Sequence, residues 1–372
     1  MTTTINNEHK KLNVPNLRFP EFQGEWEEYT LQDVVTFSNG KAHENCVNDD
    51  GDYILVNSKF VSTNGQVQKR VTSQLSPLHK SQFVMVMSDL PNGKALAKCF
   101  YVEEDNKYTL NQRVCSFTSN DGNVSRFLMY QINRNKYYLR FDDGINQTNL
   151  KKSEVLSCPV FIPIVREQEK IATLLCKIDK RIATQNKIID KLQSLIKGIA
   201  QKIVRSNKPN VRLYECVECS SSTQQESEVC EQGAYPVYGA NGIVGYLDDY
   251  NTEGEAVYII KDGSGVGTVS YVTGKCSATG TLNTLQAKDG YSLQYLYYLL
   301  KVFNFEPYKT GMAIPHIYFK DYGKAKVFCP SYTEQLQYAR LLSAIDSKLS
   351  VEKNTLRNLS LQKQYLLRQM FI

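Results

Sequence analysis

Long apolar runs are missing from this 372-residue chain, and no stretch approaches the roughly 20 apolar residues that a membrane-spanning helix needs. The opening residues MTTTINNEHKK also lack the apolar core and the small-residue cleavage site of a secretory leader, so no signal peptide is expected. Both absences favour a cytoplasmic protein. In that reducing compartment the ten cysteines are expected to remain free thiols.

Motifs that carry common chemistry are also absent. The chain has no G-x-x-x-x-G-K-[ST] loop, and it has neither Asn-Pro-Pro-Phe nor Asp-Pro-Pro-Tyr, the usual loops of an amino-methyltransferase. Cys216-x-x-Cys219, with Cys230 further on, lacks a fourth ligand, so no metal site is predicted. The four histidines are scattered and show no H-E-x-x-H spacing: His9, His43, His79 and His316. The sequence therefore predicts no catalytic residue.

Composition otherwise describes an ordinary globular protein, with 42% hydrophobic and 22% charged residues. The length allows two domains, each able to bury its own core. A net charge of +6 permits an acidic partner such as nucleic acid, although many proteins without such a partner share it. Twenty-four tyrosines, with Asn, Gln, Lys and Arg in the turns, favour surfaces that hydrogen-bond and stack. Binding is therefore predicted in place of catalysis.

A duplicated segment is the most informative feature of the chain. Ten of the twenty residues from Val160 to Asp179 recur, without a gap, 167 positions later. The first copies are Val160, Phe161, Pro163, Glu167, Gln168, Ala172, Leu174, Leu175, Ile178 and Asp179. The repeat extends from residues 144–204 onto 311–371, whereas the segments before it align poorly. The repeated segments are similar, whereas the segments that precede them differ. This pattern predicts a shared scaffold that carries two different specificities.

Both copies show the pattern of a long helix with a one-sided apolar seam. Apolar residues alternate at spacings of four and three, as in a heptad repeat. The polar interruptions are Gln185 in the first copy and Glu352 in the second, where Lys363 is a further departure. The predicted seam consists of Ile171, Leu175, Ile178, Ile182, Gln185, Ile189, Leu192, Leu342, Ile345, Leu349, Glu352, Leu356 and Leu359. Ser331-x-x-Glu334 fits a capping box at the start of the second copy. Helices of nearly 40 residues would be about 57 Å long, and such a seam must be buried.

Chain geometry predicts the relative direction of the two helices. The first ends near Ser206, and a compact second domain then delivers the chain to the start of the second helix near Thr333. The pair is therefore expected to be antiparallel, with the two domains at opposite ends and with Gln185 and Glu352 meeting near the middle. The alternative is that each helix packs separately onto its own domain.

The expected fold is α+β, with an internal pseudo-two-fold repeat and two mixed-sheet domains held apart by an antiparallel coiled coil. Its expected segments are an N-terminal arm (1–20), a first domain (21–162), a first helix (163–206), a second domain (207–330) and a second helix (331–372). Strands are predicted at 52–56, 83–87, 235–239, 255–261 and 268–272, with short helices at 125–132 and 292–302.

The glycine cluster Asp262-Gly263-Ser264-Gly265-Val266-Gly267 raises the question of nucleotide binding. A dinucleotide fingerprint requires a following helix, whose N-terminus receives the phosphates. A strand pattern, Thr268–Val272, follows here. A glycine-rich hairpin is therefore predicted, because glycine allows tight turns and close approach of the backbone.

Polar residues in turns are the candidates for contact with DNA. Asn and Gln can read adenine and Arg and Lys can read guanine, while Lys151 could also hold a phosphate. Segment 144–149 is rich in amides, and its counterpart is 311–316. The candidates are Lys41, Lys59, Lys69, Arg70, Asn92, Lys94, Gln112, Arg113, Asn146, Gln147, Asn149, Lys151, Tyr238, Asn241, Lys261, Ser264, Lys275, Thr279 and His316. Any single one of these residues could instead belong to a solvated loop.

At these residues the chain resembles the specificity subunit of a Type I restriction–modification system. The resemblance lies in Pro15–Phe22 with Gly24-Glu25-Trp26, in Tyr235–Gly242, and in the two P-x-x-x-E-Q-x-x-I/Y-A-x-L-L-x-x-I-D repeats. It spans essentially the whole chain from Pro15.

The resemblance implies two target-recognition domains, each reading one half of a split site in double-stranded DNA. The helices would act as a spacer and as a docking surface for two methyltransferase subunits, with restriction subunits joining that core. The family uses S-adenosylmethionine through the methyltransferase subunit, so no cofactor is expected on this chain.

Two other functions remain open from the residues alone. One is a coiled-coil adaptor whose two heads bind protein. The other is a DNA-modifying enzyme whose catalytic site has no recognised motif.

Overall fold

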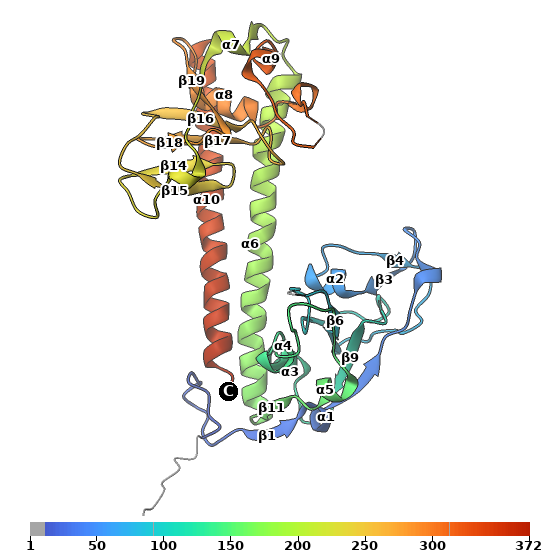
Figure 1. Ribbon diagram of the computed structural model, residues 1–372. Helices are drawn as coiled ribbons and strands as arrows, with labels where there is room; N and C mark the ends of the chain where they lie inside the picture. The colour runs from blue at the N-terminus through green and yellow to red at the C-terminus, as the bar shows by residue number, and fades with distance from the viewer. Residues whose placement is uncertain (1–11, 92, 312) are drawn as a thin grey trace, which may run out of the picture. The chain divides into compact units, whose positions relative to one another are not determined.

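The computed structural model describes residues 12–91, 93–311 and 313–372, which fold into two compact units. Unit 1 comprises Met1–Ala183 with Arg357–Ile372, and unit 2 comprises Thr184–Leu356. The opening residues 1–11 and the candidate Asn92 lie outside the described residues. Figure 1 shows the elements of both units coloured along the chain.

Unit 1 combines short strands and short helices with parts of two long helices. Its strands are β1 (Glu27–Thr30), β2 (Val35–Asn39), β3 (Tyr53–Val56), β4 (Arg70–Val71), β5 (Phe83–Val86), β6 (Ser88–Asp89), β7 (Cys99–Tyr101), β8 (Tyr108–Leu110), β9 (Val114–Ser119), β10 (Thr148–Asn149) and β11 (Pro159–Ile162). Its helices are α1 (Leu31–Val34), η1 (Glu44–Cys46), α2 (Ser58–Ser62), α3 (Ser125–Ile132), α4 (Lys136–Leu139), α5 (Lys152–Leu156) and the first part of α6 (Val165–Arg205).

Unit 2 contains the remainder of α6 and most of the second long helix. Its strands are β12 (Val211–Arg212), β13 (Val217–Ser221), β14 (Tyr235–Gly239), β15 (Gly242–Leu247), β16 (Glu255–Ile260), β17 (Val269–Thr273), β18 (Ser277–Ala278), β19 (Leu282–Ala287) and β20 (Lys326–Val327). Its other helices are α7 (Leu213–Cys216), η2 (Glu226–Glu228), α8 (Leu293–Leu300), η3 (Glu306–Tyr308), α9 (Phe319–Tyr322) and α10 (Tyr332–Gln369), whose last turns belong to unit 1.

The two heads share one strand topology although their sequences align poorly. The four-stranded order β2-β9-β5-β7 in unit 1 matches β13-β19-β16-β17 in unit 2. The three-stranded order β4-β3-β8 matches β15-β14-β18, and β1-β11 matches β12-β20. The parallel pair is also shared, since β3 pairs with β8 and β14 with β18 in parallel. The duplication therefore includes the heads as well as the long helices. Their sequences could diverge because a core constrains side-chain volume and apolar pattern more strictly than residue identity.

The predicted local elements agree with the structure. Strands form within or across every predicted segment, and α3 spans the predicted 125–132. The glycine cluster joins β16 to β17, which pair antiparallel, so it is a hairpin. Gly263 and Gly267 have φ of +92° and +88°, backbone angles that side chains with a Cβ rarely adopt.

The long helices pair antiparallel inside each unit. In unit 1 the start of α6 shares a core with the end of α10, and Leu175 and Met370 are both in it. In unit 2 the end of α6 shares a core with the start of α10, including Ile203 and Leu342. Each of these cores also includes the sheet of its head. The helices thus pack on each other as well as on their heads.

None of the predicted seam residues is exposed. Those with less than a tenth of their surface exposed are Ile171, Leu175, Ile178, Gln185, Ile189, Leu342, Leu349 and Leu359. Half-buried are Ile182, Leu192, Ile345, Glu352 and Leu356. The two polar interruptions meet in unit 2, where Gln185 donates to the Glu352 carbonyl at 3.1 Å and also to its carboxylate. Hydrogen bonds from Lys348 and then from Gln185 lower the pKa of Glu352, so this carboxylate remains charged at neutral pH.

The repeated Gln168 and Gln335 explain why the duplicated segment retains its sequence. Gln168 accepts a hydrogen bond from the Val124 N–H at 2.9 Å and donates to the Pro163 carbonyl at 2.9 Å. Gln335 does the same with Ser292 and Pro330, both at 2.9 Å. Each glutamine therefore joins a short head helix to the start of a long helix while being almost fully buried.

Several tyrosines belong to the core, so the number of tyrosines does not by itself indicate a binding surface. Tyr138, Tyr258, Tyr295 and Tyr322 are among the largest fully buried side chains. Their hydroxyls are paired, as in Tyr295, whose O–H donates to the Phe328 carbonyl at 2.8 Å. A paired hydroxyl removes most of the cost of burying tyrosine, so the residue can serve as core.

All ten cysteines are free. Within residues 12–91, 93–311 and 313–372, no helix combines the length and apolar character that crossing a membrane requires.

A buried ion pair fastens the segment before β1 to the start of α6. The Arg18 guanidinium donates to both Glu167 oxygens, at 2.8 and 2.7 Å, and the Glu167 side chain is 0% exposed. We expect Arg18→Ala to lower the free energy of unfolding by about 3–5 kcal/mol, because it leaves a buried carboxylate without its partner. Urea titration followed by circular dichroism measures this.

Lys107→Ala is the matched control, because Lys107 pairs with Glu104 in an exposed ion pair. It should cost no more than about 1 kcal/mol. Equal effects of the two variants would show that the Arg18–Glu167 pair has no special role in stability.

Candidate nucleic-acid interface

The amide-rich segment of unit 1 is held against a short strand. β10 pairs antiparallel with β6, which places Asn149 opposite Ser88. The Gln147 amide donates to the Ser88 hydroxyl at 2.8 Å and to the Asn149 side-chain oxygen at 3.2 Å. A cavity of about 200 Å³ opens here, lined by Phe141, Asp143, Asn146, Gln147, Thr148, Asn149 and Glu154. Exposed amides in a fixed arrangement suit hydrogen bonding to base edges.

Asp143 orders the loop that carries these amides. Its carboxylate accepts hydrogen bonds from the backbone N–H groups of Asn146 and Ile145 at 2.8 and 2.9 Å, and from the Asn146 side chain at 3.0 Å. The hydrogen bonds from Asn146 contribute most, and together they lower the pKa of Asp143 to about 2. Asp143 is therefore a charged acceptor at neutral pH and would repel phosphate, so its role is to shape the loop.

Unit 2 builds the corresponding place from different residues. His316 forms a β-bridge with Asp262, as Asn149 pairs with Ser88 in unit 1, and His316 lies 167 positions after Asn149. The Gly263 N–H donates to the Pro315 carbonyl at 2.9 Å, which joins the glycine hairpin to the 311–316 segment. His316 Nδ1 lies 3.5 Å from the Asp262 carboxylate, and both side chains remain partly exposed. Equivalent loops thus present an amide and hydroxyl set in one unit and a histidine–carboxylate pair in the other.

The remaining candidates of unit 1 lie in three regions. Lys41, Gln112 and Arg113 belong to adjoining loops, since Lys41 bridges to Asn111 and the Arg113 carbonyl accepts from Met87 just before β6. Lys59 lies in α2, and Lys69 and Arg70 lie at β4. Lys94 follows β6, Asn146 lies in the ordered loop, and Lys151 is the N-cap of α5. The side chains of all the candidates named in this paragraph are exposed.

The remaining candidates of unit 2 lie around the β14–β15 hairpin and the glycine hairpin. Asn241 and Ser264 are exposed, Lys261 is half-buried, and Lys275 is exposed but engaged with Glu253 at 3.7 Å. Tyr238 is half-buried against Tyr258, and burial raises the pKa of its hydroxyl.

Thr279 does not fit a role in base contact. It is 1% exposed, and its hydroxyl is hydrogen-bonded to that of Thr281 at 2.8 Å. It follows β18 directly, where its N–H pairs with the Tyr238 carbonyl, so it stabilises the loop.

Three residues of these loops escaped the sequence analysis as candidates: Ser88, Asp143 and Asp262. Ser88 and Asp262 gain their importance from partners 59 and 54 positions away, a pairing that only the folded chain creates. Asp143 carried a local signal, because an Asp side chain often accepts hydrogen bonds from backbone N–H groups two or three residues further on, and Asp143 directly precedes Gly144-Ile145-Asn146. Among the described residues, no group of three or more His, Cys, Asp or Glu side chains is arranged to hold a metal ion.

Fold and loops together define a duplicated binding module, in which one scaffold presents two different loop sets. A family model described as "Type I restriction modification DNA specificity domain" matches residues 23–194 and again residues 210–360. The chain therefore belongs to the family of Type I restriction–modification DNA specificity subunits, as its sequence resemblance predicted.

Curated relatives carry the same description. The chain is 27% identical over 117 residues to the Type I restriction enzyme EcoprrI specificity subunit of Escherichia coli, which covers 32% of this chain and 29% of that protein. It is 25% identical over 256 residues to a putative type I specificity subunit of Mycoplasma genitalium, which covers 63% of this chain and 66% of the relative. The matched regions thus span less than two thirds of either relative.

Solved structures of low sequence identity share the fold. The crystal structure of a Type I restriction–modification system S subunit from M. genitalium superposes with a TM-score of 0.67 at 18% identity, covering 96% of this chain and 99% of that one. A chain from a study of complex assembly and conformational transition of the type I R-M system gives 0.52 at 14% identity, covering 97% and 99%.

Proposed function

We propose that this chain reads a two-part DNA site, one half with each head, and directs methyltransferase and restriction subunits to it. The chain itself does no chemistry in this proposal. S-adenosylmethionine would be bound by the methyltransferase subunit, and the assembly would work in the cytoplasm, where its DNA substrate is found. Membership of the specificity family supports DNA recognition, and the finer statements are inferences from the loops and helices.

The observation that carries the proposal is the difference between two equivalent loop pairs. Ser88, Gln147 and Asn149 occupy the place in unit 1 that Asp262 and His316 occupy in unit 2. A duplicated scaffold that served one symmetric task would have no reason to vary these positions. Different donors and acceptors on the same backbone frame are what reading two unlike half-sites requires.

Affinity and specificity would come from different side chains. The exposed Lys151 and Lys94, next to the amide loop in unit 1, suit contacts to phosphates, which position the protein without reading sequence. Base-edge contacts would then come from Gln147 and Asn149 in the first head and from His316 in the second. Because phosphate contacts release counterions, binding to any DNA should weaken as salt rises, while discrimination between sequences should not.

The paired long helices would set the distance between the half-sites. α6 has 41 residues and α10 has 38, so each is about 60 Å long at 1.5 Å per residue. The antiparallel pairing in each unit supports a spacer in which the two heads face neighbouring turns of DNA. The rest of the helix surface would be available to two methyltransferase subunits.

Two single substitutions test the assignment of one half-site to each head. Gln147→Ala should relax the sequence preference at the first half-site, and His316→Ala should do so at the second. Each lost base-edge contact is expected to reduce discrimination against the wrong base by about 1–3 kcal/mol. Each variant is the matched control for the other. Selection of bound duplexes from a random library, with the assembled subunits, measures both preferences at once.

Other outcomes would redirect the proposal. If neither the isolated chain nor the assembly selects a sequence, the heads are protein-binding modules. If the isolated chain methylates DNA, the site of chemistry lies in this chain and the non-catalytic role is wrong.

A further inference from the structure

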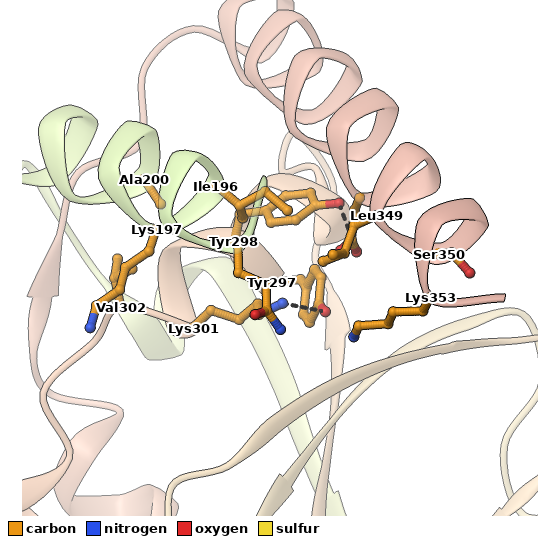
Figure 2. A pocket seen from close by; sticks show the side chains of 12 residues that line it. Ile196, Lys197, Ala200, Tyr297, Tyr298, Lys301, Val302, Leu349, Ser350 and Lys353 are labelled. Atoms are coloured by element: carbon orange, nitrogen blue, oxygen red, sulfur yellow. Dashed lines mark hydrogen bonds between the residues drawn. The ribbon is translucent and has the colours of Figure 1, made fainter. Parts of the chain in front are cut away.

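A cavity of about 480 Å³ lies in unit 2 between α8 and the two long helices (Figure 2). Its volume falls within the range of small-molecule sites, about 300–1,000 Å³. The lining residues come from three places in the sequence: α6, the end of α8, and α10. The DNA-contact candidates are not among them.

The floor of the cavity is apolar and aromatic. Ile196, Ala200, Tyr297, Tyr298 and Leu349 line it, and each is less than a tenth exposed. The Tyr298 hydroxyl donates to the Asp346 carboxylate at 3.4 Å, which holds the phenol ring in place. Buried rings with a fixed orientation provide a surface on which a flat group can pack.

The rim of the cavity is basic. Lys197, Lys301 and Lys353 line it from the three helical segments, and all three are exposed. Lys301 Nζ donates to the Tyr297 hydroxyl at 3.1 Å, so its ammonium is held at the edge of the floor. Figure 2 shows Lys353 reaching from α10 toward Tyr297. Asp346 is the single acid that lines the cavity, which leaves three positive charges against one negative charge.

In unit 1, the positions that correspond to two of the cavity-lining residues carry larger or charged side chains. At the 167-residue offset, Lys363 and Leu367 in unit 1 correspond to Ile196 and Ala200. Lys363 forms an ion pair with Asp179 at 2.5 Å and lies over the Tyr130 ring, while Leu367 packs against the core of unit 1. The smaller alanine and the uncharged isoleucine leave the cavity of unit 2 open.

Two of the three rim lysines have uncharged counterparts in the internal repeat. Lys197 corresponds to Gln364 and Lys353 to Asn186, whereas Lys301 corresponds to Arg134, which keeps the positive charge. The two copies therefore differ in two ways that act together at the cavity: smaller or uncharged side chains open a space, and two additional lysines lie at its edge. Neither change follows from packing the helices, because unit 1 packs them without either.

We propose that this cavity binds a phosphate-bearing ligand of mononucleotide size. The flat part of the ligand packs on Tyr297 and Tyr298, and its phosphates contact Lys301, Lys353 and Lys197. Lysine ammonium groups are strong phosphate partners, and the aromatic floor supplies the apolar contact that a free phosphate ion would not use. The site is separate from the recognition loops, so its occupation is independent of which DNA sequence is read.

Fluorescence anisotropy with methylanthraniloyl-ADP as the probe, on the full chain, tests this site. We expect saturable binding that ADP competes for and that adenosine does not. Ala200→Leu, which installs the residue that unit 1 already has, should weaken binding at least about tenfold. Lys301→Met with Lys353→Met should do the same. Lys191→Met, on α6 outside the cavity, is the matched control and should change affinity less than about twofold.

Three results would overturn the proposal. One is the absence of saturable binding, and another is equal affinity in the control and the cavity variants. The third concerns DNA as the source of phosphate: if duplex DNA displaces the probe and the double lysine variant loses duplex affinity to the same degree, these lysines contact DNA and no small ligand is involved. Unchanged duplex binding by that variant supports the proposal. Thermal melts confirm that each variant is folded, and the lysine variants carry the test if Ala200→Leu is not.

Discussion

Exchanging residues 20–155 for the corresponding head of another specificity subunit will change one half of the recognised DNA site and leave the other half unchanged. The reason is that the recognition loops of unit 1 lie within this segment, whereas Asp262 and His316 lie in unit 2. Each mismatched base pair in a half-site typically costs about 1–3 kcal/mol, so a half-site of several bases should be replaced completely. Sequencing of methylated sites in a host that carries the exchanged subunit measures the result.

The exchanged head must retain its contacts with the scaffold. β1 pairs with β11, the Val124 N–H donates to Gln168, and Tyr130 donates to Asp179 at 2.7 Å. A donor head with a tyrosine at the position of Tyr130 preserves the last of these. The reciprocal exchange in the second head is the control and should change only the other half. Alteration of both halves by either exchange would rule out independent reading.

The scaffold was predictable from the sequence because it is periodic and local. The seam spacing of four and three, the Ser331–Glu334 capping box and the identities shared by the two copies all act over a few helical turns. Ser331 and Glu334 do form the box, with the Ser331 hydroxyl donating to Glu334 at 2.6 Å. The short helices before each repeat were predictable for the same reason.

The common topology of the two heads could not be predicted in this way. Strand order depends on pairings such as β3 with β8, which lie more than 50 residues apart along the chain. Many combinations of apolar residues fill the same core, so the duplication leaves little identity there. The structure reveals the common topology of the two heads because the strands keep the same hydrogen-bonded pairing while their side chains differ.

The candidate interface was predictable only in part. Segment 144–149 was found because it is rich in amides and lies shortly before the repeated window Val160–Asp179, and segment 311–316 was found as its counterpart. Their partners Ser88 and Asp262 were missed, since each is brought to its loop by tertiary folding. Thr279 was selected for its chemistry alone, and burial removes it from the candidates.

Lys363 shows how a departure from a pattern can be informative. It interrupts the apolar seam of the second helix, and the structure pairs it with Asp179. The corresponding Ile196 restores the apolar pattern in the first helix, yet the cavity in unit 2 lies beside it. Lys363, which breaks the apolar pattern in sequence, thus forms an ion pair in unit 1. Ile196, which fits the pattern, lines the open cavity in unit 2.

Replacing Ile178 and Ile345 together with Asp will destabilise both units and disturb the proposed spacer. Ile178 is 5% exposed in unit 1, and Ile345 packs against the core of unit 2. Loss of a buried isoleucine typically costs about 2–5 kcal/mol, and burying an unpaired carboxylate adds to this cost. We therefore expect each single variant to lose at least about 3 kcal/mol of unfolding free energy, measured by urea titration.

Ile188→Asp is the matched control for stability, because Ile188 lies on the same helix α6 but is 37% exposed. It should change stability by less than about 1 kcal/mol, as is usual for surface substitutions. The functional readout is the spacing between the half-sites in duplexes selected by the assembled double variant. Splayed helices should broaden or shift that spacing, while each half-site sequence remains the same because the loops are untouched. A double variant that is destabilised and still selects the wild-type spacing would show that something other than the helix pair sets the distance between the heads.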